Sequence, residues 1–357
     1  MKLIHCSDLH LDSSLGTNFD DRLARERSAE LCYTFARLAA YARKNGVRAV
    51  LIAGDLFDTE RVSAATGAFV LRTVADTPEV DFLYLRGNHE ESARAFAGCA
   101  LPPNLKTFSD TWSYYSYDGV TVAGCELHRG NALSLYDSLS LPEDTTNIVL
   151  LHGQESAQPG EDLIALPLLQ NRGIHYLALG HLHSYRSGTL DRTGTYAYSG
   201  CLEGRGFDEC GEKGFVLLEA AQGQVTAQFV PFAARRAWDL SVDISGLTTA
   251  PELLGAMRRA AEDIPEKDLV RFALCGGCTP ETQKDFTFLR AQLAPEHYLV
   301  RIRDESRLAV APGSYENDVS LKGAFVRLVL ASDHTDAEKD AMIRSGLQAL
   351  RGEAITL

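Results

Sequence analysis

The sequence predicts an α/β fold in which two sheets pack face to face and helices cover the outside. Short apolar strands alternate with helical patterns along the first 90 residues, and from residue 108 to 230 short strands dominate, several joined by glycine-containing turns. Polar residues follow many of these strands directly, which places candidate chemistry at strand ends.

The elements of the first half follow from apolar spacing. Residues 2–7 form a short strand pattern, and residues 47–53 form an almost wholly apolar one of the kind buried in a parallel sheet. Between them, Leu31, Phe35 and Leu38 recur at helical spacing, and Gly46 ends that helix. A second helix is expected at 64–75 and a third strand at 81–85. Later strands are expected at 148–151, 176–179, 196–199, 214–218 and 224–230.

Three parts are expected along the chain: a catalytic domain over 1–232, a small α/β domain over 237–303 and a helical segment over 319–357. Residues 233–236 are typical of a linker. In the small domain, strands predicted at 238–244, 270–274 and 298–302 alternate with helices at 251–263 and near 284–293. Helices at 321–330 and 336–350 close the chain, and each carries an apolar stripe.

Composition limits the function classes. The 357 residues are 45% hydrophobic and 23% charged, which excludes a wholly disordered, collagenous or coiled-coil chain. The net charge of −13 has the wrong sign for a protein that grips nucleic acid through its overall charge. Met1 leads straight into a strand pattern, and no run of about eighteen apolar residues occurs. We therefore expect a cytoplasmic protein that does not contact a membrane.

Histidines are concentrated in the first half, and most of these stand beside Asp, Asn or Gly at strand ends. The segments are Asp8-Leu9-His10, Gly54-Asp55-Leu56-Phe57-Asp58, Gly87-Asn88-His89-Glu90, His152-Gly153 and Gly180-His181-Leu182-His183. Any one of them has an ordinary explanation, such as a buried core histidine, a helix cap or a turn. Five in series at strand ends are difficult to assign to coincidence, because ligands of α/β proteins gather at the carboxyl ends of strands.

The spacing of these residues predicts a centre with two metal ions. Residues at i and i+2 of an extended segment point the same way, so Asp8 with His10, and His181 with His183, can each chelate one ion. The donors exceed what one tetrahedral ion can use, and two ions that share a carboxylate account for all seven: Asp8, His10, Asp55, Asn88, His152, His181 and His183. Imidazole with carboxylate suits manganese, iron or zinc. We expect manganese, with iron, zinc or magnesium as alternatives.

The five segments resemble the pattern of the calcineurin-like metallophosphoesterases over residues 1–230. The resemblance implies that Asp8, His10 and His183 hold one metal ion. It implies that the other is held by Asn88, His152 and His181, with Asp55 as the bridge between the two. His89 matches the histidine that contacts the phosphate and acts as an acid or transition-state stabiliser. Asp58 is expected to orient Asp55 or a histidine. The implied reaction is phosphoester hydrolysis.

Within that superfamily the sequence is most similar to the SbcD-type DNA repair nuclease subunits, which include the proteins called YhaO. The segments 5–12, 54–58 and 177–183 carry this likeness, and the small domain looks like the capping domain of such nucleases. The likeness implies a manganese-dependent exonuclease or endonuclease that acts on DNA, forms a homodimer and works with an SbcC-like coiled-coil ATPase. Glu90 stands where many relatives have Asp, and His175-Tyr176 stand where an acidic residue is common. Neither departure removes a ligand.

Several alternatives stay open. Arg186 and Arg205, with Arg192 and Lys213, form either a phosphate-binding rim or solvated surface. The two C-terminal helices either bury their apolar stripes against each other or dock on the ATPase. A stand-alone phosphodiesterase for a small nucleotide or another phosphoester needs the same metals but no DNA surface. A non-catalytic scaffold is disfavoured because it has no reason to retain every ligand.

Overall fold

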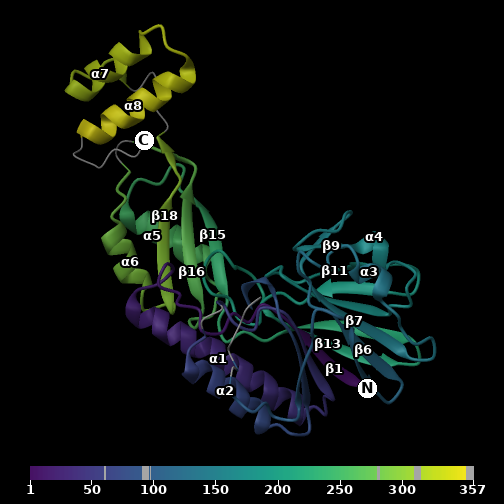
Figure 1. Cartoon of the computed structure of the whole chain (residues 1–357). Coiled ribbons are helices and arrows are strands. Elements are labelled where there is room, and N and C mark those ends of the chain that lie inside the picture. The colour runs from purple at the N-terminus through teal and green to yellow at the C-terminus, as the bar shows by residue number, and fades with distance from the viewer. Residues whose placement is uncertain (60–61, 91–95, 97, 280–281, 309–314, 351–357) are drawn as a thin grey trace. The chain divides into compact units, whose positions relative to one another are not determined.

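The computed structural model describes residues 1–59, 62–90, 96, 98–279, 282–308 and 315–350. The chain divides into two compact units, Met1–Ala237 and Trp238–Leu357, and each is described by itself (Figure 1). Residues 351–357 of the expected C-terminal segment lie outside the described residues. So do residues 60–61, 91–95 and 97 of the expected catalytic domain, and residues 280–281 of the small domain.

The first unit is built on two six-stranded sheets. One has the order β14-β13-β1-β2-β3-β4, with bounds Gln224–Pro231, Gly214–Ala221, Lys2–Cys6, Ala49–Ala53, Asp81–Leu85 and Leu105–Thr107. The other has the order β11-β12-β10-β7-β6-β5, with bounds Arg186–Thr189, Thr195–Tyr198, Tyr176–Gly180, Thr146–His152, Val120–Gly124 and Ser113–Tyr117. In each sheet four consecutive strands are parallel, β1 to β4 and β12 to β6.

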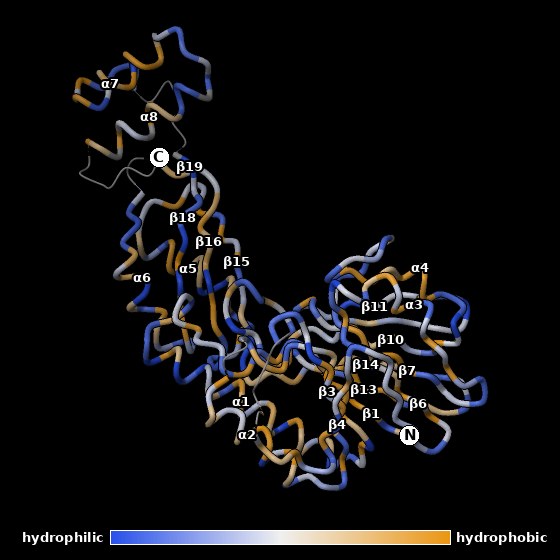
Figure 2. Tube along the Cα trace, in the orientation of Figure 1, coloured by the Kyte–Doolittle hydropathy of each residue, from blue (hydrophilic) through white to orange (hydrophobic). Residues whose placement is uncertain are grey.

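An apolar core fills the space between the two sheets. It includes Leu51 and Leu83 from the first sheet and Ile148 and Leu150 from the second, all fully buried. The strands β2 and β10 are buried along their whole length, and the hydrophobic colour of the trace is concentrated in such central strands (Figure 2). Strands buried on both faces need an apolar run without alternation, which is the pattern that residues 49–53 show. The two-sheet α/β sandwich is therefore confirmed.

Helices cover the outer faces of the sandwich. The helices α1 (Asp21–Lys44) and α2 (Ala64–Ala75) lie over the first sheet, where the ring of Phe35 meets that of Phe82 at 6.1 Å (Figure 1). The short helices α3 (Leu135–Ser138) and α4 (Leu166–Leu169) pack on the second sheet, next to the small pair β8 (Gln154–Ser156) and β9 (Leu163–Ala165). The helix α1 begins after Asp20, whose carboxylate accepts the N–H groups of Arg22 and Leu23.

The segment predicted to be a linker is fixed to the first unit. The N–H of Ala234 donates to Glu203 at 2.6 Å, and Nε of Arg235 donates to Glu30 of α1 at 2.7 Å. Glu203 is itself buried and accepts from Arg27 and from Thr34. A buried carboxylate needs several such donors, so these residues are structural and do not form a free tether.

The second unit begins with a three-stranded sheet of order β15-β16-β18, with bounds Ala237–Asp243, Leu269–Cys275 and Leu299–Asp304. The helices α5 (Ala250–Ala260) and α6 (Phe286–Leu293) share its apolar core, and α5 starts with a capping box between Thr249 and Glu252. Two short strands, β17 (Gly277–Cys278) and β19 (Arg307–Leu308), pair in parallel. In the sequence β17 follows β16, and β19 follows β18. The helices α7 (Leu321–Leu330) and α8 (Asp336–Leu350) pair through a small cluster of their own. Within the described part of the chain, every helix is too short or too polar to cross a membrane.

Candidate metal centre

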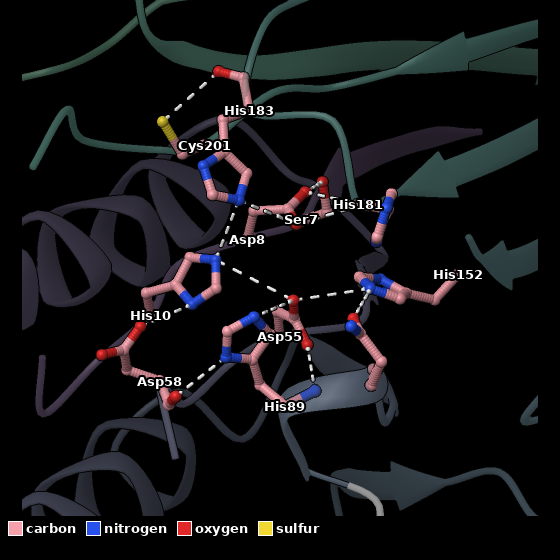
Figure 3. A network of polar contacts seen from close by, with 12 residues as sticks. Ser7, Asp8, His10, Asp55, Asp58, His89, His152, His181, His183 and Cys201 are labelled. Carbon is pink, nitrogen blue, oxygen red and sulfur yellow. Dashed lines mark hydrogen bonds and ion pairs between the residues drawn. The ribbon is translucent and has the colours of Figure 1, made fainter. Parts of the chain in front are cut away.

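The residues of the five segments, four of which contain histidine, come together at one edge of the sandwich. They lie at or just after the ends of β1, β2 and β3 of the first sheet and of β7 and β10 of the second, and β3 leads into a short 3-10 helix over Asn88–Glu90. Because the strands in each set are parallel, their carboxyl ends point to the same edge. The candidate ligands that face one another there are Asp8, His10, Asp55, His152, His181 and His183 (Figure 3), together with Asn88, whose Oδ1 contacts His152.

The backbone at this edge is strained where the ligands lie. Asp8, His10 and Asp55 adopt φ values of 52°, 46° and 51°, in the left-handed region that residues with a side chain rarely occupy. Hydrogen bonds hold two of them there, because the N–H of Asp8 donates to the carbonyl of Gly54 at 3.1 Å and that of His10 to the carbonyl of Asp55 at 3.0 Å. Strain of this kind costs about 1–3 kcal/mol per residue and is found mostly at functional sites.

Two glycines allow the strand ends to approach closely. A Cβ on Gly180 would lie 1.8 Å from the carbonyl oxygen of Ala53 and 2.8 Å from Nδ1 of His152. A Cβ on Gly54, whose φ is 93°, would lie 2.0 Å from the same nitrogen. Any side chain at either position would therefore displace His152.

One half of the centre contains Asp8, His10 and His183, whose candidate ligand atoms all lie within 4.8 Å of one another. Nε2 of His10 is 3.1 Å from Nε2 of His183, which lies 3.8 Å from Oδ1 of Asp8. The other nitrogen of each ring faces a carboxylate. Nδ1 of His10 lies 3.1 Å from Oδ1 of Asp58, and Nδ1 of His183 lies 2.7 Å from Oε1 of Glu209.

The other half contains Asn88, His152 and His181. Nε2 of His152 is 3.0 Å from Oδ1 of Asn88, and Nδ1 of His152 lies 2.9 Å from the carbonyl oxygen of Ala53. The rings of His181 and His152 form an edge-to-face pair with their centroids 5.4 Å apart. The backbone N–H of His181 donates to both carboxylate oxygens of Asp8, at 3.0 and 3.1 Å, so this half is tied to the first.

Asp55 lies between the two halves. Its Oδ2 is 3.9 Å from Nε2 of His10 and 3.4 Å from Nε2 of His152, although it is almost fully buried. Burial alone would raise the pKa of Asp55, but the hydrogen bond and charge of His152, with the charge of His10, hold that pKa well below its ordinary value. Burial would lower the pKa of His152, but Asp55 raises it to about 9. A proton on His152 therefore offsets the negative charge of Asp55, as a bound cation would.

The donor set fits two cations. Glu209 accepts hydrogen bonds only, so its contact with Nδ1 of His183 favours a ring proton there and a lone pair at Nε2, and the ion-pair contact of Asp58 favours the same arrangement in His10. The Ala53 carbonyl likewise keeps a proton on Nδ1 of His152, so Nε2 of that ring presents a lone pair once a bound cation replaces its second proton. Two lone pairs 3.1 Å apart in one half, and a lone pair facing carboxylate and amide oxygens in the other, are stabilised by positive charge. Imidazole mixed with carboxylate suits transition metals, and the identity of the metal does not follow from the geometry.

His89 lies at the mouth of the centre. Its Nδ1 is 3.0 Å from the carbonyl oxygen of Asp58, its Nε2 is 4.0 Å from Oδ2 of Asp55, and its ring is 5.0 Å from that of His10. The side chain is 43% exposed, whereas those of the adjacent ligands Asp55 and His10 are buried. This histidine can therefore reach a bound substrate from the solvent side.

Two of the arginines suggested by the sequence, Arg186 and Arg205, have acidic partners. Arg186 pairs with Glu155 at 2.6 Å and is exposed, whereas Arg205 is mostly buried and contacts Asp58 and Glu209. Lys213 is buried and donates to the carbonyl of His183 at 2.6 Å, so it is not a surface residue. Sequence reasoning missed Glu209. The only local signal was an Arg and a Glu four residues apart in a glycine-containing loop.

The chain belongs to the family described as "Calcineurin-like phosphoesterase", whose family model matches residues 1–185. It is therefore a member of a family of metal-dependent phosphoesterases, in agreement with the donor set at the strand ends.

Three curated relatives give a finer comparison. The chain is 26% identical over 248 residues to the uncharacterized metallophosphoesterase YhaO of Bacillus subtilis, an alignment that covers 64% of this chain and 60% of that protein. It is 25% identical to the DNA double-strand break repair protein Mre11 of Methanopyrus kandleri, over 99% of this chain and 82% of that one. Identity to the Mre11 of Aeropyrum pernix is 27%, over 68% and 64% of the two chains. The chain thus spans less than two thirds of YhaO.

Solved structures also align with part of the chain. TT1561 of Thermus thermophilus aligns with a TM-score of 0.41 at 15% identity, and the alignment covers 64% of this chain and 98% of that one. A dimetal phosphatase from Danio rerio aligns with a TM-score of 0.39 at 12% identity, over 64% and 98% of the two chains.

Proposed function

We propose that the protein is a two-metal phosphodiesterase that cleaves DNA, as an SbcD-like nuclease subunit in DNA repair. The observation that carries the proposal is the position of Asp55, with one carboxylate oxygen within 4 Å of a histidine nitrogen of each half of the centre. A carboxylate in that position can bridge two ions about 3.5–4 Å apart, the separation that suits in-line attack on a phosphoester.

Each half of the centre has an assigned role. Asp8, His10 and His183 would hold one ion, Asn88, His152 and His181 would hold the other, and Asp55 would contact both. Two bound divalent ions would activate a water molecule and neutralise charge on the phosphoryl oxygens. His89, which is not among these ligands, is exposed at the mouth of the centre, where its Nε2, in the imidazolium form, would donate a proton to the leaving oxygen or stabilise its charge. Asp58 keeps His10 in the tautomer that presents Nε2.

DNA is the proposed substrate because of the relatives and the second unit. The Mre11 proteins are named for DNA double-strand break repair, and the alignment to the Methanopyrus protein covers nearly this whole chain, including the second unit. A phosphodiesterase for a small substrate needs no such unit. That stand-alone phosphodiesterase remains the second candidate function, because the metal centre alone would serve it equally well.

The assay uses the full chain with Mn²⁺, supercoiled plasmid, a short DNA hairpin and bis(p-nitrophenyl) phosphate. A DNA nuclease cleaves all three, and EDTA abolishes each activity. Cleavage of the small diester without cleavage of either DNA would support the stand-alone phosphodiesterase. Binding of DNA without any hydrolysis, in the presence of bound metal, would support a non-catalytic scaffold.

An SbcC-like ATPase is the proposed partner, and the paired helices α7 and α8 are its proposed docking site. The two helices bury Val326, Val329 and Ile343 against each other, which uses only part of their apolar surface. Leu321 and Leu328, seven residues apart on α7, remain 71% and 74% exposed. Residues at that spacing share one helix face, as helix-in-groove contacts require.

Changing both leucines tests the docking site. Leu321→Glu with Leu328→Glu should abolish pull-down of an SbcC-like ATPase from the same genome, while cleavage of the small diester stays unchanged. Leu133→Glu is the matched control, because Leu133 is 75% exposed in the other unit. Equal binding by the double variant and the control would exclude this face as the docking site.

A further inference from the structure

Arg205 lies between two carboxylates that are distant in the sequence. Its Nη1 donates to Oδ1 of Asp58 at 2.6 Å, and its Nε and Nη2 both donate to Oε1 of Glu209, at 3.0 and 2.8 Å. The backbone N–H of Arg205 also donates to Oε2 of Glu209 at 2.7 Å. Only 19% of the arginine side chain is exposed. A planar guanidinium with a rigid set of donors can fix two carboxylates at once, which a lysine cannot do.

Each of these carboxylates faces a histidine of the same half of the metal centre. Asp58 lies 3.1 Å from Nδ1 of His10, and Glu209 lies 2.7 Å from Nδ1 of His183. One arginine therefore controls two imidazoles through two carboxylates. The hydroxyl of Ser13 donates to the second oxygen of Asp58 at 3.0 Å, which fixes that carboxylate further.

Arg205 offsets part of the negative charge of the two carboxylates. Without its guanidinium, Asp58 and Glu209 would both face the metal centre with no cation placed between them. A carboxylate that is mostly buried and has lost its counter-charge is costly, so each would turn toward solvent. That movement would release the imidazole that the carboxylate orients.

We propose that Arg205 is the positioning residue of the Asp8–His10–His183 half of the metal centre. Its donors are directed at Asp58 and Glu209, so it acts on the metal through the histidines and does not bind substrate phosphate. The inference rests on the proposed function only in that the half-site holds a metal ion. Only this half should depend on Arg205, because the Nδ1 atom of His152 in the other half contacts the carbonyl of Ala53.

The test measures metal binding directly, without substrate. Wild-type protein and Arg205→Met are titrated with Mn²⁺, with free Mn²⁺ followed by EPR and bound metal by elemental analysis. Wild type should bind two ions. The variant should bind one ion as wild type does and the other about 10–100-fold more weakly, the usual consequence of removing a group that orients a ligand. Arg205→Lys should restore only part of the lost affinity, because an ammonium cannot reach both carboxylates with fixed geometry.

Double variants identify the affected half. Arg205→Met combined with His183→Ala should lose no more than one ion, because both changes act on the same half. Arg205→Met combined with His152→Ala should bind neither ion tightly. Glu209→Gln added to Arg205→Met should cost less than the sum of the two single changes, because the residues act as one unit. If Arg205→Met does not fold, Asp58→Asn and Glu209→Gln singly must each weaken one ion and spare the other.

A matched control breaks a similar pair elsewhere. Arg258 of α5 donates through Nε and Nη2 to Glu296, at 3.0 and 2.7 Å, so Arg258→Met should leave both ions bound. The proposal is overturned if Arg205→Met binds two ions normally and shows only a raised KM for DNA, which would make Arg205 a phosphate ligand. Equal weakening of both ions would also overturn it. A wild type that binds two ions and cleaves no DNA would refute the nuclease and leave this inference standing.

Discussion

The two halves of the metal centre hold their histidines in different ways. In the half with Asp8, the Nδ1 atoms of His10 and His183 face the side chains of Asp58 and Glu209. In the half with Asn88, the Nδ1 atom of His152 faces the backbone carbonyl of Ala53, the last residue of β2. A backbone carbonyl at a strand end is fixed by the sheet, whereas a side-chain carboxylate is fixed only by the charges around it.

This difference predicts different sensitivities to substitution. The half oriented by carboxylates depends on Arg205, which lies 22 residues beyond His183, in a loop that packs back onto it. The half oriented by the backbone depends on the close approach of β2, β7 and β10, which Gly54 and Gly180 permit. Substitutions in the loop should therefore affect one ion, and substitutions at the strand ends should affect the other.

The largest effect is expected from a substitution of Asp55, the carboxylate that the two halves share. Asp55→Asn should lose both ions together and reduce phosphodiester hydrolysis by more than about 10³-fold, because several kcal/mol of charge stabilisation depend on them. Elemental analysis of protein prepared with Mn²⁺ and the rate on a small diester measure the two effects. A variant that kept two ions and full activity would show that Asp55 does not bridge the halves.

The next effect separates chemistry from metal binding. His89→Ala should leave both halves loaded and lower the rate of DNA cleavage by about 10²-fold or more, since an acid or charge-stabilising group is lost. Metal content and DNA affinity are measured beside the rate. If metal content falls in proportion to activity, His89 is itself a ligand and the assignment of ligands to the two halves is wrong.

A smaller effect should fall on the half oriented by the backbone. Gly180→Ala places a methyl group against the Ala53 carbonyl and Nδ1 of His152, so one ion should bind about 10–100-fold more weakly. Gly255→Ala in α5, where the nearest atom would be 3.5 Å away, is the control and should not alter metal binding. Mn²⁺ titration compares the two variants. Loss of the ion that Arg205→Met weakens, in place of the other, would contradict the comparison.

The smallest expected effect is on the stability of the fold, through a buried histidine that connects the two sheets. His5 of β1 is buried between the sheets, with Nδ1 2.9 Å from the hydroxyl of Tyr176 and Nε2 3.1 Å from the carbonyl of Leu179. Burial lowers the pKa of His5 to about 3, although the hydrogen bond to Leu179 opposes this. The unfolded chain has the higher pKa, so stability from neutral His5 is fully present above about pH 6.5 and is lost as the pH falls toward 3.

Urea unfolding at pH 7 and pH 5, in the presence of a chelator, measures the contribution of His5. Wild type should lose more free energy of unfolding between these pH values than His5→Gln does, by up to about 2 kcal/mol. Glutamine has both a donor and an acceptor, so it can replace the hydrogen bonds without titrating. The same loss in both proteins would show that His5 is not the group responsible.

Much of the fold could be predicted because the signals were local. Residues 64–75, 81–85, 321–330 and 336–350 form the expected elements with the expected bounds. The start of α1 at Asp21 was not predicted, because the apolar stripe begins only several residues later and the cap at Asp20 carries no apolar signal. The short elements α3 and α4 were missed for a related reason, since four residues are too few to show a helical period.

The metal centre was accessible from sequence because each candidate ligand follows a strand, and a parallel sheet brings such residues to one edge. The sequence by itself therefore determined the strands that precede the ligands, the five segments and the donor types. Only the tertiary structure decided that Glu209 reaches His183 and that Arg205, which the sequence assigned either to a phosphate-binding rim or to solvated surface, lies between Glu209 and Asp58. The positions of strands follow from apolar runs within a few residues, whereas a contact between a loop and distant side chains depends on the path of the folded backbone.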